Sequence, residues 1–75
     1  MSEIAPRITV DPNVRFGKPV IQGTRVPVDL VVGKMGAGLS VEEVCEEYGL
    51  VREDVLAALS YAARSVADEQ VRAVK

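Results

Sequence analysis

Side chains able to bind anions are concentrated in one short segment of this 75-residue sequence. Within it, basic or hydroxyl side chains alternate with glycine and proline residues, which direct the course of the backbone: Arg15, Gly17, Lys18, Pro19, Gly23, Thr24, Arg25 and Pro27. Proline fixes one backbone angle and glycine permits tight turns, so this spacing predicts a fixed presentation of the basic groups. Groups held in this way suit phosphate or an acidic protein surface. The alternative is that the segment only forms turns, and that its charges keep an edge strand from pairing.

Enzymatic and metal chemistry have little support in the sequence. The chain has no histidine and one cysteine, Cys45, so it cannot assemble the usual zinc site or a Cys–His catalytic pair. Four carboxylates lie close together at Glu42, Glu43, Glu46 and Glu47. Without histidine they are interpreted as a solvated helix face, not as a metal site. We therefore expect no catalytic residue, no metal and no cofactor.

The composition indicates one small globular domain that works with a partner. Apolar residues make up 48% of the chain and charged residues 27%, with a formal net charge of −2. A chain of this length buries only about 60% of its unfolded surface, which leaves marginal stability and favours a homodimer or another protein partner. The single cysteine suits a reducing cytoplasm. No segment resembles a signal peptide or is long enough to span a membrane.

The two halves of the chain differ in charge and in backbone chemistry. Residues 1–39 hold all four prolines, five of the six glycines, and five basic against three acidic residues. Residues 40–75 hold four basic and eight acidic residues. The front is therefore expected to be basic and rich in turns, and the back acidic and helical.

Short β-branched runs predict strands in the first third of the chain. Ile8–Val10 stops at an Asp-Pro pair, and Val20–Ile21 and Arg25–Val26 flank a turn at Gly23. These strands are too short to form a sheet by themselves. We therefore expect them to pack on helices or to pair across a dimer.

Helix boundaries are marked by capping residues. The first predicted helix takes Pro27 as its first helical residue and ends at the glycines around position 37. The second opens with a capping box of Ser40 and Glu43 and ends at Gly49. The third begins near Arg52, and its apolar residues are expected to face inward: Val55, Leu56, Leu59, Ala62, Ala63 and Val66.

The second and third helices, joined by a short turn at Gly49, have the spacing of a helix-turn-helix. This predicts a mainly α fold, a trihelical bundle with a short N-terminal β-strand or hairpin element. We expect residues 1–7 to be a tail and residues 8–67 to be the domain. Within the domain, 8–27 would be the β and turn element and 27–67 the three helices, with 68–75 a helix extension or a frayed tail.

Several strings of the sequence closely resemble the family known as domain of unknown function 433. They are Ile8–Pro12, the run Gly-Lys-Pro-Val-Ile-Gln-Gly-Thr-Arg-Val-Pro-Val at 17–28, a Gly-x-Ser-x-Glu-Glu string and a Tyr-Gly-Leu string. The resemblance covers about residues 8–67 and implies a homeodomain-like helix-turn-helix with a short N-terminal β element. It also implies a VapB-type antitoxin of a prokaryotic type II toxin–antitoxin pair, encoded beside a PIN-like ribonuclease. One departure is Val51, where members of the family often have Ser or Thr at the N-cap of the third helix.

The predicted function is therefore an antitoxin that neutralises a PIN-like ribonuclease by protein contact and binds its own promoter as a dimer. Arginine placed among the metal-holding carboxylates of such a toxin would displace the metal or block the substrate. The candidate toxin contacts are Arg25, Arg64, Arg72 and Lys75. The candidate DNA contacts are Arg15, Lys18 and Arg25 on phosphates and Arg52 on bases. The alternative is a protein-interaction module that does not bind DNA, which the acidic second helix and the net charge favour.

Overall fold

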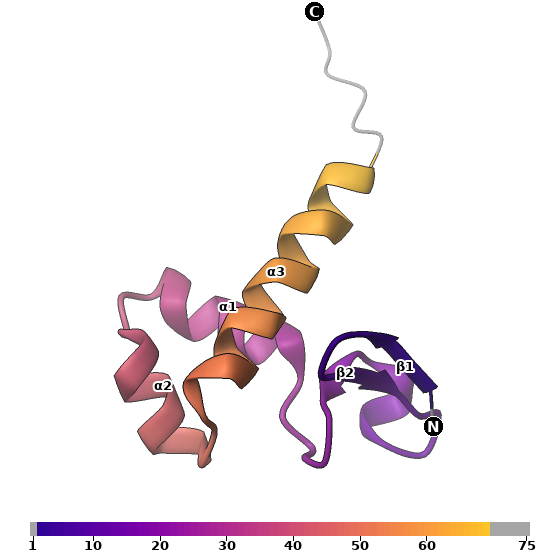
Figure 1. Cartoon of the computed structure of the whole chain (residues 1–75), viewed down its shortest axis with the longest axis horizontal. Coiled ribbons are helices and arrows are strands. Elements are labelled where there is room, and N and C mark those ends of the chain that lie inside the picture. Colours follow the sequence, from indigo (N-terminus) through magenta and orange to yellow (C-terminus); the bar gives the residue numbers. More distant parts are fainter. Residues whose placement is uncertain (1, 70–75) are drawn as a thin grey trace, which may run out of the picture.

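A computed structural model describes residues 2–69 and shows three helices beside a small sheet (Figure 1). The sheet has three antiparallel strands in the order β1-β2-β3: β1 (Ser2–Ala5), β2 (Ile8–Val10) and β3 (Val20–Ile21). A single 3₁₀ turn, η1 (Arg15–Gly17), lies between β2 and β3. The helices are α1 (Val28–Gly36), α2 (Val41–Tyr48) and α3 (Arg52–Asp68). The expected mainly helical architecture with an N-terminal β element is confirmed at this level.

Residues 2–5 form a strand where the sequence predicts a tail. β1 pairs with β2 through Ser2↔Val10, Glu3↔Thr9 and Ala5↔Ile8, with an irregularity between Glu3 and Ala5. The Glu3 carboxylate also accepts a hydrogen bond from the backbone N–H of Arg7 in the connecting turn, at 3.0 Å. β1 is mostly exposed, so it carries no clear apolar alternation. Its conformation depends on hydrogen bonds supplied by β2, which the residues of the segment do not reveal.

The predicted strand at Arg25–Val26 does not form. Its place is taken by irregular backbone in which the Ile21 N–H donates to the Val26 carbonyl, at 2.9 Å, and Val20 forms an isolated bridge with Pro27. The chain therefore returns along β3 as expected, but only for one or two residues. Pro27 has no N–H to donate and α1 begins at Val28, so no longer ladder can develop.

Local capping chemistry sets the helix ends. The Ser40 hydroxyl accepts from the Glu43 N–H and the Glu43 carboxylate accepts from the Ser40 N–H, at 3.1 and 2.8 Å, so the predicted capping box is confirmed. Gly49 ends α2 with a φ of 67°, in the left-handed region that glycine tolerates. Pro27 is the N-cap of α1 with extended angles, so this helix starts one residue later than predicted.

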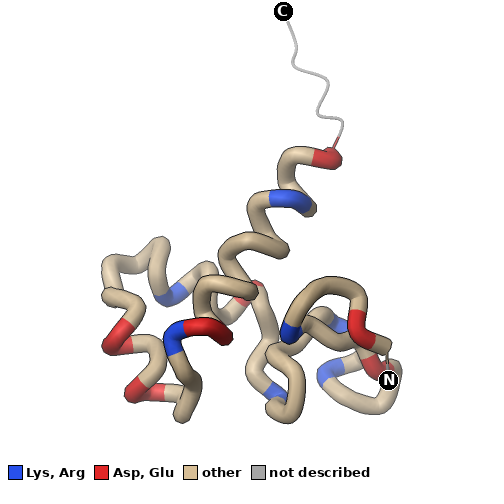
Figure 2. Tube along the Cα trace, in the orientation of Figure 1, with Lys and Arg blue, Asp and Glu red and all other residues tan. Residues whose placement is uncertain are grey.

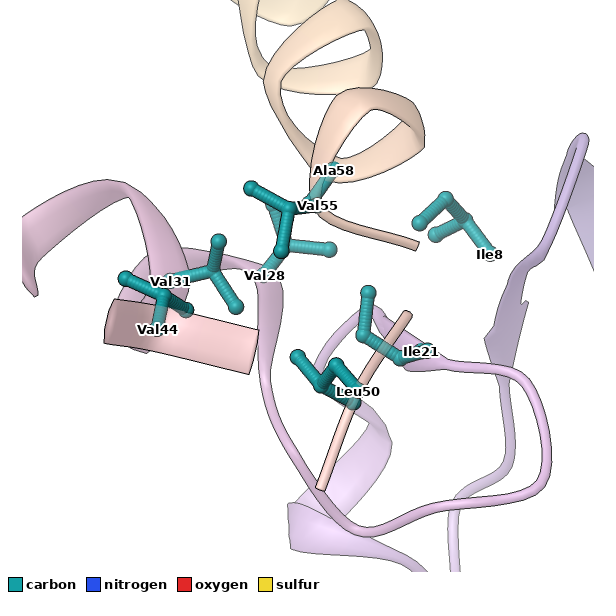
Figure 3. Close-up of a cluster of buried hydrophobic side chains, with 8 residues drawn as sticks. All are labelled: Ile8, Ile21, Val28, Val31, Val44, Leu50, Val55 and Ala58. Atoms are coloured by element: carbon teal, nitrogen blue, oxygen red, sulfur yellow. The ribbon is translucent and has the colours of Figure 1, made fainter. Parts of the chain in front are cut away.

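The core joins the sheet to all three helices (Figure 3). It contains Ile8 and Ile21 from paired strands, Val28 and Val31 from α1, Val44 from α2, Leu50 from the turn, and Val55 and Ala58 from α3. Each of these side chains is at most 7% exposed. The two-residue strand β3 is therefore held by packing against helices, which a sheet of this size requires.

Only part of the apolar pattern of α3 faces the core. Val55 and Ala58 are buried and Leu59 and Ala62 are half-buried, whereas Leu56 is 44% exposed and Ala63 and Val66 are exposed. The prediction was wrong for these last three residues. Figure 1 shows that the C-terminal end of α3 projects beyond the other elements and has little on which to pack, which explains the exposure there. Leu56 lies near the start of α3 beside the buried Val55, and it is exposed because it is on a different side of the helix.

We expect Val51→Ser to stabilise the domain. Val51 is the N-cap of α3, and only the reciprocal half of a capping box is present there: the Asp54 carboxylate accepts from the Val51 N–H at 3.1 Å. A serine hydroxyl would accept from the first turn of α3 and add about 1 kcal/mol. For a domain of this size the melting temperature should rise by about 4–8 °C. Val51→Ala is the control, because Val51 is 53% exposed and loses little packing, and an unchanged or lower melting temperature for the serine variant would contradict the assigned helix start.

Candidate functional site

The Gly- and Pro-rich segment forms a rigid link between β3 and α1. The Thr24 hydroxyl donates to the Ile21 carbonyl at 2.8 Å and accepts from the Val26 N–H at 3.0 Å. Gly23 has a φ of 79°, which closes the turn, and the Pro19 carbonyl accepts from the Val28 N–H at 2.9 Å. These bonds fix the backbone on both sides of Arg25, whose side chain is exposed. The segment therefore presents this guanidinium on a preformed turn.

A second rigid turn carries Arg15. Three successive residues, Arg15, Phe16 and Gly17, have φ angles of 52°, 58° and 83°. Glycine adopts this region freely, but arginine and phenylalanine occupy it at an energetic cost. The turn is closed by hydrogen bonds from the Gly17 N–H to the Val14 carbonyl and from the Lys18 N–H to the Arg15 carbonyl, both 3.1 Å.

A hollow of about 550 Å³ between η1 and α1 brings three basic side chains together. Arg15, Lys18 and Lys34 line it, together with Asp29. The Lys18 ammonium lies 2.9 Å from the Asp29 carboxylate, which offsets one of the positive charges. Arg25 and Arg52 do not line this hollow, so the structure unites only two of the four predicted DNA contacts.

The Lys18–Asp29 pair makes stability weakly dependent on pH. The Lys18 ammonium hydrogen-bonds to Asp29 and holds the pKa of that carboxyl below its ordinary value of 3.8. A carboxyl with a lower pKa in the folded chain stabilises the fold above its unfolded pKa and loses this contribution as the pH falls through the folded pKa. The side chains are 53% and 65% exposed, so the contribution is small, about 0–1 kcal/mol.

We therefore expect Lys18→Gln to lower the free energy of unfolding slightly near neutral pH, and this difference to shrink as the pH falls below 3.8. Urea unfolding of both chains across this range measures the effect. A difference that stays constant with pH would show that the substitution acts through something other than the Asp29 carboxylate.

Arg52 lies in an acidic environment. Its guanidinium is 3.5 Å from the Glu42 carboxylate on α2. Figure 2 shows acidic positions along α2 and several basic positions around the N-terminal β element. The exposed acidic side chains on α2 are Glu42, Glu43, Glu46 and Glu47. The only base-reading candidate is thus flanked by charges that repel phosphate.

Of the four candidate DNA contacts, Arg15 and Arg25 have no ion-pair partner in the described residues. Within residues 2–69, neither guanidinium has a carboxylate at ion-pair distance, whereas Lys18 and Arg52 each have one. Arg64 is exposed on α3 and donates to the Ser60 hydroxyl one turn earlier, at 2.9 Å. The remaining toxin-contact candidates, Arg72 and Lys75, lie outside the described residues.

Two residues that the sequence analysis did not single out are prominent in the structure. The Arg7 guanidinium reaches from the β1–β2 turn to the Asp54 carboxylate in the first turn of α3, at 2.8 Å, and so ties the sheet to that helix. The Phe16 side chain is fully exposed. A signal for Phe16 was available, because the chain's single phenylalanine stands between Arg15 and Gly17, outside any apolar periodicity.

Three further observations concern metal ligands, membrane-spanning helices and the single cysteine. In the described part of the chain, no three acidic, cysteine or histidine side chains gather as metal ligands would. Across residues 2–69, no helix combines the length and the apolar run that crossing a bilayer requires. Cys45 is a free thiol, half-buried on α2.

Comparison with known proteins gives one family and two solved structures of interest. The family described as "Protein of unknown function (DUF433)" matches residues 8–62. A crystal structure of a DUF433 member protein from Anabaena variabilis ATCC 29413 is 32% identical, with a TM-score of 0.76 over 81% of this chain and 61% of that one. The crystal structure of Rv2018 from Mycobacterium tuberculosis is 33% identical, with a TM-score of 0.64 over 69% of this chain and 24% of that one. The chain thus spans less than two thirds of either structure. No curated protein matches the sequence.

Proposed function

The chain belongs to the DUF433 family, whose function is unknown, and from this premise we propose that it is the antitoxin of a type II toxin–antitoxin pair. In this proposal it is a cytoplasmic, non-enzymatic homodimer that neutralises a PIN-like ribonuclease by protein contact and binds its own promoter. The observation that carries the proposal is the presentation of Arg25. Its guanidinium is exposed on a turn that Thr24 holds rigid, and it has no carboxylate partner within residues 2–69.

A rigid, unpaired arginine suits insertion into a cluster of carboxylates. The ribonuclease would hold its metal ions between acidic side chains, and a guanidinium can bind two carboxylate oxygens at once. Because the turn around Arg25 is already ordered, little backbone entropy is lost when the complex forms. Arg64 on α3 would add a second contact, with Arg72 and Lys75 beyond the described residues.

Promoter binding is proposed through a helix-turn-helix formed by α2, the Gly49 turn and α3. Gly49 reverses the chain in a left-handed conformation, and Leu50 is buried directly after it, which supports this interpretation. Phosphate contacts would come from Arg15 and Lys18 at the hollow and from Arg25 on its turn. To contact a base edge, the Arg52 guanidinium would have to leave the Glu42 carboxylate with which it is paired.

Co-purification with the product of the adjacent reading frame tests the toxin contact. We expect a small protein with spaced Asp and Glu residues to form a stable complex with the full chain. A chain truncated after Ala67 locates the contact: loss of the complex assigns neutralisation to the C-terminal residues, and retention assigns it to Arg25 and Arg64. If the full chain does not bind the neighbouring protein or reduce its ribonuclease activity, the antitoxin proposal is wrong.

The second candidate function is a protein-interaction module that does not bind DNA. The exposed acidic face of α2 and the Arg52–Glu42 pair favour it, because both oppose approach to phosphates. A salt titration with promoter DNA separates the two candidates. Site-specific binding that falls steeply with salt supports a promoter function, and no binding at low salt leaves the interaction module.

A further inference from the structure

We infer that Phe16 of one copy of this chain seats in an apolar groove of a second copy, between α1 and the end of α3, and that the contact is reciprocal. The inference deepens the homodimer in the proposed function and rests on that dimer alone, not on the toxin or on DNA. Four features of the described residues carry it: the groove, the exposed phenylalanine, the charges beside each, and their common location.

The groove has a volume of about 430 Å³ and mostly apolar walls. Val32 of α1, Pro19 of the motif segment, and Tyr61, Ala62 and Val66 of α3 form much of it. Val66 is 66% exposed, although it belongs to the apolar pattern of its helix. An apolar hollow of this kind on a small domain is typical of a binding surface. The ring of Tyr61 offers an edge or face to an incoming aromatic side chain.

Phe16 has the properties of the matching anchor. Its side chain is 100% exposed, and three successive left-handed residues hold it on the η1 turn. A strained turn that displays a large apolar side chain to water gains nothing within the monomer. Aromatic anchors that fill a pocket on the partner are the usual centre of a protein interface. The rigidity of η1 means that little order must be imposed when the ring enters the groove.

The charges beside the anchor and the groove are complementary. Arg15 precedes Phe16 and has no carboxylate partner within residues 2–69. On α3, Tyr61, Ser65 and Asp68 follow one helix face, so a carboxylate lies one turn beyond the groove. The last turn of α3 contains no basic residue, which leaves the negative end of its helix dipole uncompensated in the described residues. The Arg15 guanidinium of the second copy would neutralise both, and in this dimer the proposed phosphate contacts would then fall to Lys18 and Arg25.

The location of the two features permits a reciprocal contact. Lys18 and Asp29 line both the groove and the hollow that contains Arg15, the residue before Phe16, so the η1 turn and the groove are neighbours. A two-fold axis beside them places each Phe16 in the other copy's groove. An acidic or nucleic-acid partner would use Arg15 but would leave the apolar groove uncovered. A second copy of this chain would pair with Arg15 and would also cover the apolar groove.

Sedimentation of the purified chain over a range of concentrations tests the anchor. We expect a dimer of twice the 8.1 kDa chain mass, and a dissociation constant that rises about 30-fold or more in Phe16→Ser. Leu56→Ser is the matched control, because this exposed apolar side chain is on α3 but does not line the groove, and it should leave the constant unchanged. Far-UV circular dichroism confirms that both variants remain folded.

Charge reversal tests the predicted partner of Arg15. Arg15→Glu and Asp68→Arg each place like charges opposite one another at both contacts of a homodimer, so each variant should dimerise more weakly than the wild type. A mixture of the two variants restores an opposite-charge pair at both contacts, and we expect it to form the heterodimer at wild-type strength. The effects should diminish at high salt.

Three outcomes would overturn the interface. The wild-type chain could remain monomeric at high concentration, or Phe16→Ser could leave the dimer intact. The mixture of Arg15→Glu and Asp68→Arg could also dimerise no more strongly than either variant by itself. If Phe16→Ser stays dimeric but loses binding to a single-stranded oligonucleotide, the ring stacks on bases instead. None of these measurements uses the toxin, so their failure and that of the antitoxin proposal are separate results.

Discussion

If the proposed antitoxin function holds, Arg25→Ala is expected to weaken the complex with the proposed PIN-like toxin by about 30-fold or more. Removing one partner of a desolvated, hydrogen-bonded charge pair costs about 2–5 kcal/mol, because the opposite charges remain buried and unpaired. In the free chain Arg25 is exposed and has no ion-pair partner among residues 2–69, so the fold should not depend on it. Calorimetry with the purified proposed toxin measures binding. The same titration with toxin freed of its metal ions is the reference.

Two further variants make this result specific to the guanidinium. Arg25→Lys keeps the charge but cannot bind two carboxylate oxygens in one plane, so it should lose part of the affinity. Gln22→Ala changes an exposed side chain on the same turn and should bind like the wild type. If Arg25→Ala binds the toxin normally, the contact lies on α3 or beyond Glu69, and the presentation of Arg25 has another purpose.

Ile8→Ala is expected to remove a large part of the stability of the domain. Ile8 is fully buried on β2, is paired with Ile21 of β3, and belongs to the cluster that joins the sheet to all three helices. Truncation of a buried isoleucine costs about 2–5 kcal/mol, from lost burial and from the cavity that remains. At about 0.05–0.15 kcal/mol per residue, a domain of 75 residues has a free energy of unfolding of about 4–11 kcal/mol, so this loss is a large fraction of it.

Urea unfolding of the variant, with Ile4→Ala as the matched control, measures this loss. Ile4 lies on the neighbouring strand β1 and is 46% exposed, so its truncation should change the free energy of unfolding by less than about 1 kcal/mol. Equal effects of the two substitutions would mean that the sheet does not pack on the helices as the structure shows. The melting temperature of Ile8→Ala should fall by more than about 8 °C.

Elements with local signals were predicted correctly from the sequence. The bounds of α2 follow from Ser40 and Glu43 at one end and Gly49 at the other, and all three act within a few residues of their own position. The family resemblance rested on the motif string, which the match to DUF433 over residues 8–62 confirms. The start of α1 was wrong by one residue, because Pro27 suits the N-cap as well as the first turn.

Elements without local signals were missed or misassigned. The side chains on β1 are exposed at Ser2, Glu3 and Ile4, and only the pairing with β2 makes this segment a strand. Val66 has the helical spacing of a core residue, but α3 extends beyond the surface that covers it, and Leu56 lies on a different side of the helix from the buried Val55. A periodic pattern shows which side of a helix is apolar, and it does not show how far along that side a neighbour extends.

The sequence by itself determined the family, the three helices and the constrained basic segment, because each depends on residue types at short spacing. Only the tertiary structure decided which charges are free. Lys18 is paired with Asp29, Arg52 with Glu42 and Arg7 with Asp54, whereas Arg15 and Arg25 have no such partner within residues 2–69. It alone also exposed the Phe16 side chain to water and formed an apolar groove between α1 and α3. The ion pairs join residues up to 47 positions apart. The spacing of neighbouring residues carries no information about such contacts, or about which side chains the fold leaves exposed.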